Sequence, residues 1–431
     1  MPAGGSRCYS PPAMWRPRFT LSAFCFTCLA LSYMDRWNLS VAAPLMMKEF
    51  GWTETTMGLL QSVFFYGFTL SHLPGGWLAD RFGGRRVLGA GTLGWSLTTI
   101  ATPLASGFGG LAAMRVGLGL GEGVNMPSIS SLVARWFPLE ERTRATVVNL
   151  TGIHAGTLIA MPLSAWIAAT YGWRAIFYAY GAVGLVWVAL WSAWVPEEPP
   201  AGPEHGRVVD VPWGVFLRHP AVWALLATTF ITNWTAWFMY AWLPTYFIQA
   251  HGFSLKGSGL VSAVPNLAMI CAGLASGWTA DRLIAGGLPV SRVRKLVLGT
   301  GFVGATVFLL VIPRVETPYG AVACLSAALS CFALGATTVL VNSLDLAPRH
   351  AGVLVGLQGT AGNVAGMVSP LLGGAIVQRT GSWDLNFYLI AALLVVGIVV
   401  WTRWSSGEPI TLAPAPPSAE PWPAPRARPA P

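Results

Sequence analysis

The sequence predicts an all-α membrane protein with twelve transmembrane helices, arranged as two halves of six. Composition, the spacing of apolar runs and an internal repeat all support this class. Of the 431 residues, 54% are hydrophobic and only 10% are charged, whereas soluble domains have roughly 25% charged residues. The mean hydropathy of +0.57 also excludes a soluble globular protein. Twelve spans of about 20 residues leave room only for short loops, and not for a large catalytic domain outside the membrane.

Apolar runs bounded by charged residues and by Gly/Pro clusters define the spans. They are expected at residues 18–46, 54–79, 87–105, 108–134, 145–170, 175–195, 219–249, 257–280, 296–313, 318–343, 352–378 and 384–404. The predicted organisation is an N-terminal six-helix bundle (1–195), a polar linker (196–218), a C-terminal bundle (219–404) and a tail (405–431). Because the tail is dominated by Pro and Ala, it cannot bury a core and is expected to be disordered.

The two halves repeat each other in parallel. The segment Gly76-Trp77-Leu78-Ala79-Asp80-Arg81 recurs 201 residues later as Gly277-Trp278-Thr279-Ala280-Asp281-Arg282. Pro44 with Gly51 is likewise echoed by Pro244 with Gly252. Two parallel halves predict a central cavity near mid-membrane that is exposed alternately to each side.

Basic residues give the orientation. If both termini are cytoplasmic, nineteen of the 26 Lys and Arg residues lie on that side and five lie outside, while Arg36 and Arg115 fall inside spans. This asymmetry is a strong positive-inside signal. With only three lysines and short loops, the chain is typical of a bacterial inner-membrane protein, so we expect a multi-pass protein of the cell inner membrane with both termini in the cytoplasm.

Neither an enzyme nor a metal or cofactor site is indicated. The spans contain no nucleophile–base pair and no metal-ligating cluster, and the CxxC of Cys25 and Cys28 lies in a continuous apolar run where packing is expected. The net charge of +9 does not form a basic stripe, so nucleic acid is not an expected partner.

The repeated loop is predicted to act as a gate. Small residues in the first copy permit a tight reversal between two helices, and its carboxylate can face a helix N-terminus or an arginine. Such a cluster can hold one access state closed and release it in the other. A simple anchor of positive charge is the alternative. The gating residues are expected to be Gly76, Asp80, Arg81, Arg85, Asp281 and Arg282.

Four charged residues fall inside spans, where one charge at the bilayer centre costs about 2.5–3.5 kcal/mol or more. Asp35 and Arg36 lie in the first span, and Arg115 and Glu122 in the fourth. Pro127 is expected to kink the fourth span. The seven-residue spacing of Arg115 and Glu122 predicts that both face one cavity. Because the four charges sum to zero, an incoming anion leaves the cluster negative unless a carboxylate is protonated. A static ion-pair network that braces the two helices is the alternative.

These residues carry a family resemblance. Asp35-Arg36-x-Asn38, Arg115 with Glu122-Gly123 and Pro127, and Gly152-x-x-Ala155-Gly156-x-x-Ile159-Ala160-Met161-Pro162-Leu163 resemble the anion:cation symporter family of the major facilitator superfamily. That family includes vesicular glutamate and nucleotide carriers, sialic acid and sodium-phosphate carriers and bacterial sugar-acid:proton symporters. The resemblance covers almost the whole chain. It implies the major facilitator fold and a secondary transporter that imports a small organic anion with protons. It also implies that Arg36 binds the anion and that Asp35 and Glu122 take part in proton coupling.

Further polar residues are candidates for hydrogen bonds to the substrate, with core packing as the alternative for each. Together with Arg36 and Arg115 they complete the predicted binding set: Tyr33, Tyr66, Asn125, His154, Asn233 and Asn342. The span at 219–249 lacks the arginine of glutamate carriers, so glutamate is not expected as the substrate. The expected partners are a small organic anion, protons (with sodium as the alternative) and the lipid bilayer, and the protein is expected to be a monomer. The runner-up function is a proton-coupled drug or metabolite exporter of the same superfamily.

Overall fold

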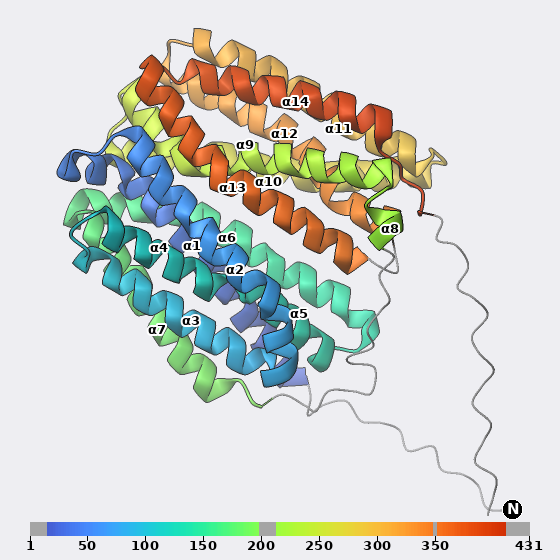
Figure 1. The fold of residues 1–431 in the computed structure, drawn as a ribbon, viewed down its shortest axis with the longest axis horizontal. Coiled ribbons are helices and arrows are strands. Elements are labelled where there is room, and N and C mark those ends of the chain that lie inside the picture. Colours follow the sequence, from blue (N-terminus) through green and yellow to red (C-terminus); the bar gives the residue numbers. More distant parts are fainter. Residues whose placement is uncertain (1–14, 198–212, 348–350, 411–431) are drawn as a thin grey trace, which may run out of the picture.

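The chain folds into long helices that cross the molecule side by side (Figure 1). The computed structural model describes residues 15–197, 213–347 and 351–410. In the first half lie α1 (Trp15–Phe50), α2 (Glu54–Phe82), α3 (Gly84–Ala101), α4 (Phe108–Gly123), α5 (Asn125–Trp136), α6 (Leu139–Tyr171) and α7 (Trp173–Trp194). In the second half lie α8 (Trp213–Phe216), α9 (Pro220–His251), α10 (Leu255–Ala285), α11 (Val290–Val311), α12 (Pro318–Leu346), α13 (Ala351–Thr380) and α14 (Asp384–Trp404). With α4 and α5 counted as one span and the one-turn α8 set aside, the described residues form the twelve predicted spans, so the fold class is confirmed.

The fourth span is interrupted where Pro127 was expected to kink it. The break falls at Val124, between α4 and α5. Proline has no N–H and therefore cannot donate to the carbonyl four residues earlier, that of Gly123. A ring nitrogen of His72, Nδ1, lies 3.0 Å from this carbonyl oxygen, and the ring stacks on Phe68. His72 thus supplies the hydrogen bond that Pro127 removes.

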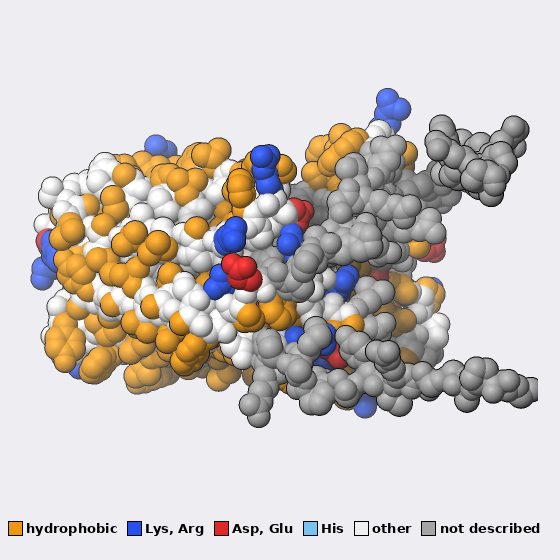
Figure 2. Space-filling view, turned by 90° about the horizontal axis from the view of Figure 1, so that it is seen from below, with side chains coloured by type: hydrophobic (Ala, Val, Ile, Leu, Met, Phe, Trp, Pro, Cys, Tyr) orange, Lys and Arg blue, Asp and Glu red, His pale blue; other side chains and the backbone are white. Residues whose placement is uncertain are grey.

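Apolar composition matches a membrane environment. Within the described part of the chain, seven helical segments, those of α6, α7 and α10–α14, are long and apolar enough to cross a membrane on length and composition alone. Among the remaining spans, α1 and α4 carry the charges within the membrane. On the face of the molecule in Figure 2, hydrophobic and uncharged groups cover the left part of the described surface, and most charged side chains gather from the middle of the view toward the right, with a few at the left end.

The two halves meet at one end of the molecule. We call the end where α7 finishes and α9 begins the linker side, and the end with the turns at Gly51 and Gly252 the far side. Near the far side, Ser40 Oγ of α1 donates to the Ala241 carbonyl of α9 at 3.0 Å, and Gln249 Nε2 donates to Glu54 at 3.2 Å. A Cβ on Gly58 of α2 would lie 2.4 Å from the Pro370 carbonyl oxygen of α13. The halves are therefore tightly packed on the far side.

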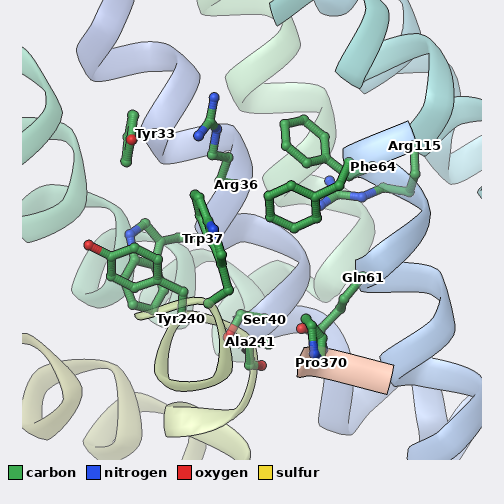
Figure 3. A pocket seen from close by; sticks show the side chains of 12 residues that line it. Tyr33, Arg36, Trp37, Ser40, Gln61, Phe64, Arg115, Tyr240, Ala241 and Pro370 are labelled. Atoms are coloured by element: carbon green, nitrogen blue, oxygen red, sulfur yellow. Dashed lines mark hydrogen bonds between the residues drawn. The ribbon is translucent and has the colours of Figure 1, made fainter. Parts of the chain in front are cut away.

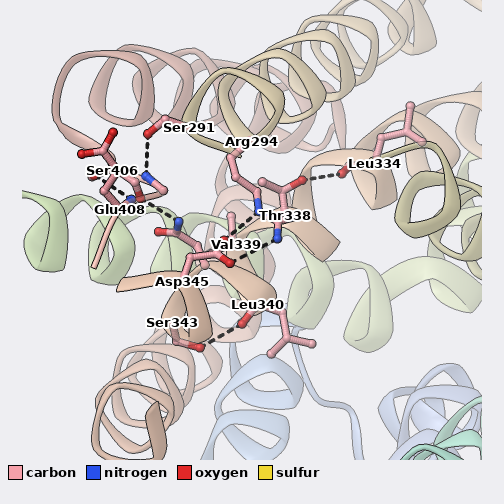
Figure 4. A network of polar contacts seen from close by, with 12 residues as sticks. Ser291, Arg294, Leu334, Thr338, Val339, Leu340, Ser343, Asp345, Ser406 and Glu408 are labelled. Carbon is pink, nitrogen blue, oxygen red and sulfur yellow. Dashed lines mark hydrogen bonds and ion pairs between the residues drawn. The ribbon is translucent and has the colours of Figure 1, made fainter. Parts of the chain in front are cut away.

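The start of the predicted tail is part of the folded structure. Residues 405–410 lie against the linker-side ends of α11 and α12 (Figure 4). The Gly407 N–H donates to Ser291 Oγ at 2.6 Å, and the Ile410 N–H donates to the Leu346 carbonyl at 2.8 Å. The expectation of disorder from Ser405 onward is wrong for these six residues, because their backbone groups find partners on neighbouring helices. The rest of the tail and residues 198–212 of the linker lie outside the described residues.

Candidate functional site

Two arginines line one small pocket between the halves, which we call the arginine pocket (Figure 3). Its volume is about 40 Å³, whereas pockets for small-molecule ligands are typically about 300–1,000 Å³. Residues of α1, α2, α4, α9 and α13 line it: Tyr33, Arg36, Trp37, Ser40, Gln61, Phe64, Phe65, Arg115, Trp237, Tyr240, Ala241 and Pro370. In this conformation the pocket is therefore nearly closed around its two cations.

Aromatic rings surround the Arg36 guanidinium. Its central carbon lies 4.5 Å from the ring centre of Tyr33, 4.9 Å from that of Phe68 and 5.1 Å from that of Phe64. Trp237 of the second half adds a fourth ring at 5.8 Å. Ring faces attract cations most strongly where water is excluded. These rings therefore stabilise the charge of Arg36 and fix its position without neutralising it.

Glu122 forms an ion pair with Arg36 but does not itself line the pocket. Arg36 Nε donates to Glu122 Oε2 at 2.8 Å, and the Glu122 side chain has no exposed surface. The other carboxylate oxygen, Oε1, has no hydrogen-bond partner among the described residues. The prediction that Arg115 and Glu122 face one cavity is thus not met in this conformation, because Arg36 covers Glu122.

Arg115 lies in the pocket without a carboxylate at ion-pair distance among the described residues. It is 5% exposed, and its Nε and Nη1 groups find no acceptor in the described part of the chain. Phe64 lies between the two cations, with its ring centre 5.5 Å from the Arg115 guanidinium carbon. Buried donors without acceptors are costly, so an anion entering this pocket would find hydrogen-bond donors already in place.

Asp35 is buried but does not line the arginine pocket. Consecutive helical residues point about 100° apart, so Asp35 faces away from its neighbour Arg36. The side chain is 2% exposed and accepts a hydrogen bond from Asn38 Nδ2 at 3.1 Å. The four intramembrane charges thus lie in the same half without sharing one chamber: Asp35, Arg115 and Glu122 are buried, and Arg36 is partly exposed.

A larger cavity lies between the halves toward the linker side, and we call it the linker-side cavity. Its volume is about 620 Å³. The predicted residues Tyr33, His154 and Asn233 line it, and Tyr33 lines the arginine pocket as well. Other polar residues that line it are Thr229, Thr232, Thr337, Gln358 and Asn363. Most of these residues lie in the linker-side halves of their helices, so this cavity extends from the arginine pocket toward the linker side.

Three predicted binding residues lie elsewhere. Tyr66 is 54% exposed and lines neither cavity, because its neighbours Phe65 and Gly67 occupy the packed faces of α2. Asn125 is 2% exposed within the first half, next to the break at Val124. Asn342 is fully buried at the linker-side end of α12, where its Nδ2 donates to the Ser406 carbonyl. In this conformation none of the three lines the arginine pocket or the linker-side cavity, so a role for them in substrate binding stays a prediction.

The first copy of the predicted gating loop holds helices of its own half together. Asp80 accepts from Ser131 Oγ at 3.3 Å, and Arg85 donates from Nε to the Val195 carbonyl at the end of α7 at 2.8 Å. Arg81 lies over the ring of Trp77. Gly83, with φ of +89°, permits the reversal between α2 and α3, whereas a Cβ on Gly76 would meet nothing within 4 Å.

The second copy makes fewer contacts. Arg282 lies over the ring of Trp278 at 3.5 Å, and Asp281 is exposed. These contacts of the two copies all lie within their own half.

Of the four aromatic residues around Arg36, Tyr33 was predicted, and Phe64, Phe68 and Trp237 were missed by reasoning from charge. A signal for them exists in the helical spacing: Gln61, Phe64, Phe65 and Phe68 follow the i, i+3, i+4, i+7 pattern of one helix face. Trp237 likewise lies between Asn233 and Tyr240 on one face of α9. Each stripe contains a polar residue, which distinguishes it from a face that packs in a purely apolar core.

Comparison with known proteins identifies the family. The family model of the Major Facilitator Superfamily matches residues 25–370 and 285–430. The chain belongs to the major facilitator superfamily. Among solved structures, a bacterial homolog to the human lysosomal transporter Spinster, in an inward-facing and unoccupied conformation, has a TM-score of 0.77. It is 17% identical and is matched over 94% of this chain and 100% of its own, which supports the major facilitator fold.

Curated relatives bear out the predicted anion:cation symporter branch of the superfamily. A probable anion transporter 4 from chloroplasts of Oryza sativa subsp. japonica is 38% identical over 91% of this chain and 69% of its own. The chloroplastic sodium-dependent phosphate transport protein 1 of Arabidopsis thaliana is 37% identical over 91% and 80% of the two chains. The chloroplastic ascorbate transporter of Arabidopsis thaliana is 36% identical over 91% and 76%. The chain is thus a major facilitator transporter and not an enzyme.

Proposed function

We propose that this transporter imports a small organic anion together with protons, by alternating access of the arginine pocket to the two sides of the membrane. The observation that carries the proposal is the imbalance inside the pocket. Two guanidinium groups line it, and only Arg36 has a carboxylate at ion-pair distance among the described residues. An anion that binds both arginines would satisfy the free donors of Arg115.

Competition for Arg36 supplies the coupling. An anion that takes the guanidinium from Glu122 leaves this fully buried carboxylate without its hydrogen-bond donor. A buried, unpaired charge costs several kcal/mol, so Glu122 takes up a proton as the anion binds. When the anion leaves, Arg36 returns to Glu122 and the proton is released. Asp35, which is held by Asn38, is the second carboxylate available for this role.

The membrane potential explains why such coupling is needed. Moving one uncompensated charge across the membrane costs or yields about 2.3 kcal/mol per 100 mV. An interior-negative potential therefore opposes the entry of an anion. One proton per negative charge removes this penalty, and a pH gradient that is acidic outside then drives accumulation.

A sugar acid or similar hydroxylated carboxylate fits the two cavities best. The carboxylate would lie at the arginines, and hydroxyl groups would reach the amide and hydroxyl side chains of the linker-side cavity, such as Thr229, Asn233 and Asn363. Anions appear in the names of the relatives, among them phosphate and ascorbate. Phosphate with sodium coupling is the second candidate, because the relative named for sodium-dependent phosphate transport is 37% identical.

The transport cycle requires the halves to separate on the far side. In the present conformation that side is held by contacts such as Ser40 with Ala241 and Gly58 with Pro370. We assign the linker side to the cytoplasm of a monomeric inner-membrane protein with both termini inside, as the basic residues favour. The repeated loops, Asp80 and Arg85 in one half and Asp281 and Arg282 in the other, would then close the cytoplasmic side when the far side opens.

Uptake into proteoliposomes tests the proposal. The panel is gluconate, glucuronate, ascorbate, succinate, phosphate and tetraphenylphosphonium, each driven by an imposed proton gradient or an imposed sodium gradient. We expect the proton gradient to drive accumulation of at least one hydroxylated carboxylate. The Glu122→Gln variant should lose this accumulation and keep exchange of the same anion. Accumulation of tetraphenylphosphonium alone, or uptake driven by sodium and not by protons, would overturn the proposal.

A further inference from the structure

A groove beside the first turns of α1 combines apolar walls with basic residues. It has a volume of about 320 Å³ and lies between α1 and the junction of α5 and α6 on the linker side. It is lined by Arg18, Phe19, Ser22, Phe137, Glu141, Arg144, Ala145 and Val148. The groove is separate from the arginine pocket and the linker-side cavity, with which it shares no residue.

The apolar part of the groove faces outward from the helix bundle. Phe19 is 65% exposed and Val148 is 46% exposed. In a membrane protein, side chains exposed in this way along the spans contact lipid chains. The groove is thus open to hydrocarbon along one wall, and its basic residues lie at the ends of the helices where phospholipid headgroups are found.

The arginines of the groove have hydrogen-bond donors that could bind an anion. Arg18 Nη1 lies 3.7 Å from Glu141, whose side chain is 51% exposed. Such long, exposed ion pairs contribute about 0–1 kcal/mol. Arg18 Nε is buried and has no hydrogen-bond partner among the described residues, and Arg144 is exposed. A phosphate group placed between the two arginines would outcompete the single weak contact with Glu141.

The wall of the groove is already formed. Arg142 donates from Nη2 to the Ala134 carbonyl at 2.7 Å and from Nε to the Phe137 carbonyl at 3.1 Å. These bonds fix the turn between α5 and α6, and with it the positions of Phe137 and Arg144. Arg142 is used in this way, and among the described residues that line the groove the two arginines available to a ligand are Arg18 and Arg144.

We infer that this groove binds one anionic phospholipid, with the phosphate between Arg18 and Arg144 and an acyl chain along Phe19, Phe137 and Val148. Charge complementarity and the hydrocarbon-facing wall together select a lipid over a soluble anion. Basic pockets at the membrane surface attract anionic headgroups with about 1 kcal/mol per basic residue. Two arginines are therefore expected to change affinity by about 30-fold, since 1.4 kcal/mol is tenfold.

Native mass spectrometry of the purified full-length protein tests the inference, with dioleoylphosphatidylglycerol and dioleoylphosphatidylcholine as probes. The wild type should retain one phosphatidylglycerol with about 30-fold preference over phosphatidylcholine. The double variant Arg18→Gln/Arg144→Gln should lose this preference. Arg292→Gln with Arg403→Gln removes the same charge from exposed linker-side positions outside the groove and should keep it. Val148→Trp, which fills the groove and leaves the charges in place, should also displace the lipid.

Free glycerol 3-phosphate distinguishes a lipid from a soluble phosphate. At millimolar concentration it should not displace phosphatidylglycerol, because it lacks the acyl chain that contacts the apolar wall. The inference is overturned if glycerol 3-phosphate competes fully, if both lipids are retained equally, or if the Arg292/Arg403 control loses the preference to the same extent.

Discussion

Replacing Arg36 with lysine isolates what the guanidinium does beyond carrying a charge. Arg36 donates to Glu122 at 2.8 Å while four aromatic rings hold its position. A lysine keeps the positive charge but offers a compact ammonium in place of a planar fork, so it cannot satisfy both the carboxylate and an incoming anion with the same geometry. The variant should fold, because the charge of Glu122 remains compensated.

The expected magnitude follows from one lost hydrogen bond to a charged group. Such a bond is worth about 1.5–3 kcal/mol, which corresponds to roughly 10- to 150-fold weaker anion binding. Isothermal titration calorimetry with the anion selected by the uptake panel measures this change.

Arg174→Lys is the matched control. Arg174 also pairs with a glutamate, Glu49, at 2.6 Å and lies over a tryptophan ring at 4.4 Å, but on the far-side surface. It should bind the anion as the wild type does. Wild-type affinity in Arg36→Lys, or an equal loss in Arg174→Lys, would refute the assignment of the anion site.

Three further predictions concern the packing that positions the site. His72→Ala should lower the free energy of unfolding by about 1–3 kcal/mol, because it leaves the Gly123 carbonyl unpaired. In a Pro127→Ala background, where residue 127 has an N–H, the same change should lower this free energy much less. Equal losses of stability in both backgrounds, measured by thermal unfolding, would contradict the pairing. Gly58→Ala, whose Cβ would clash with the Pro370 carbonyl across the halves, should shift the population toward the far-side-open state in double electron–electron resonance. Gly67→Ala is the control: its Cβ would clash with Val116 within one half, so it should reduce thermal stability without shifting the population. Identical distance distributions for Gly58→Ala and the wild type would contradict the expected shift toward the far-side-open state. A chain that ends at Trp404 should unfold several degrees below one that ends at Ile410, because it loses the bonds to Ser291, Asn342 and Leu346; equal melting temperatures would show that the packed segment adds no stability.

The helices could be predicted from the sequence because the membrane imposes a strong and local rule. Every span must bury its backbone polar groups in helical hydrogen bonds and present an apolar surface. The runs of apolar residues therefore locate the spans directly, and the repeated Asp80-Arg81 and Asp281-Arg282 segments identify the two halves. From the sequence, Pro127 predicted a kink in the fourth span but did not locate the break at Val124. The position of a break depends on which group replaces the hydrogen bond that proline cannot donate. Here that group is His72, which is distant in sequence.

The candidate site could be predicted only in part. Arg36, Arg115 and Glu122 are recognisable because buried charges are costly and rare, but their mutual contacts depend on rotations that the sequence does not specify. Asp35 and Arg36 are adjacent in the chain and yet face different surroundings. Asn342 is a polar residue within a span, which is typical of a binding residue, but its amide donates to the Ser406 carbonyl of the tail. The composition of that tail segment had predicted disorder. Tyr66 shows the same limit, because one helical step from Phe65 turns a side chain from the interface to the exterior.

The most direct test of coupling is the number of protons that enter with each anion. Pyranine trapped inside proteoliposomes reports internal acidification, and radiolabelled anion reports uptake in the same vesicles. We predict that the wild type carries about one proton per negative charge, and that Glu122→Gln moves the anion down its own gradient without internal acidification. An unchanged proton count in Glu122→Gln would contradict the account.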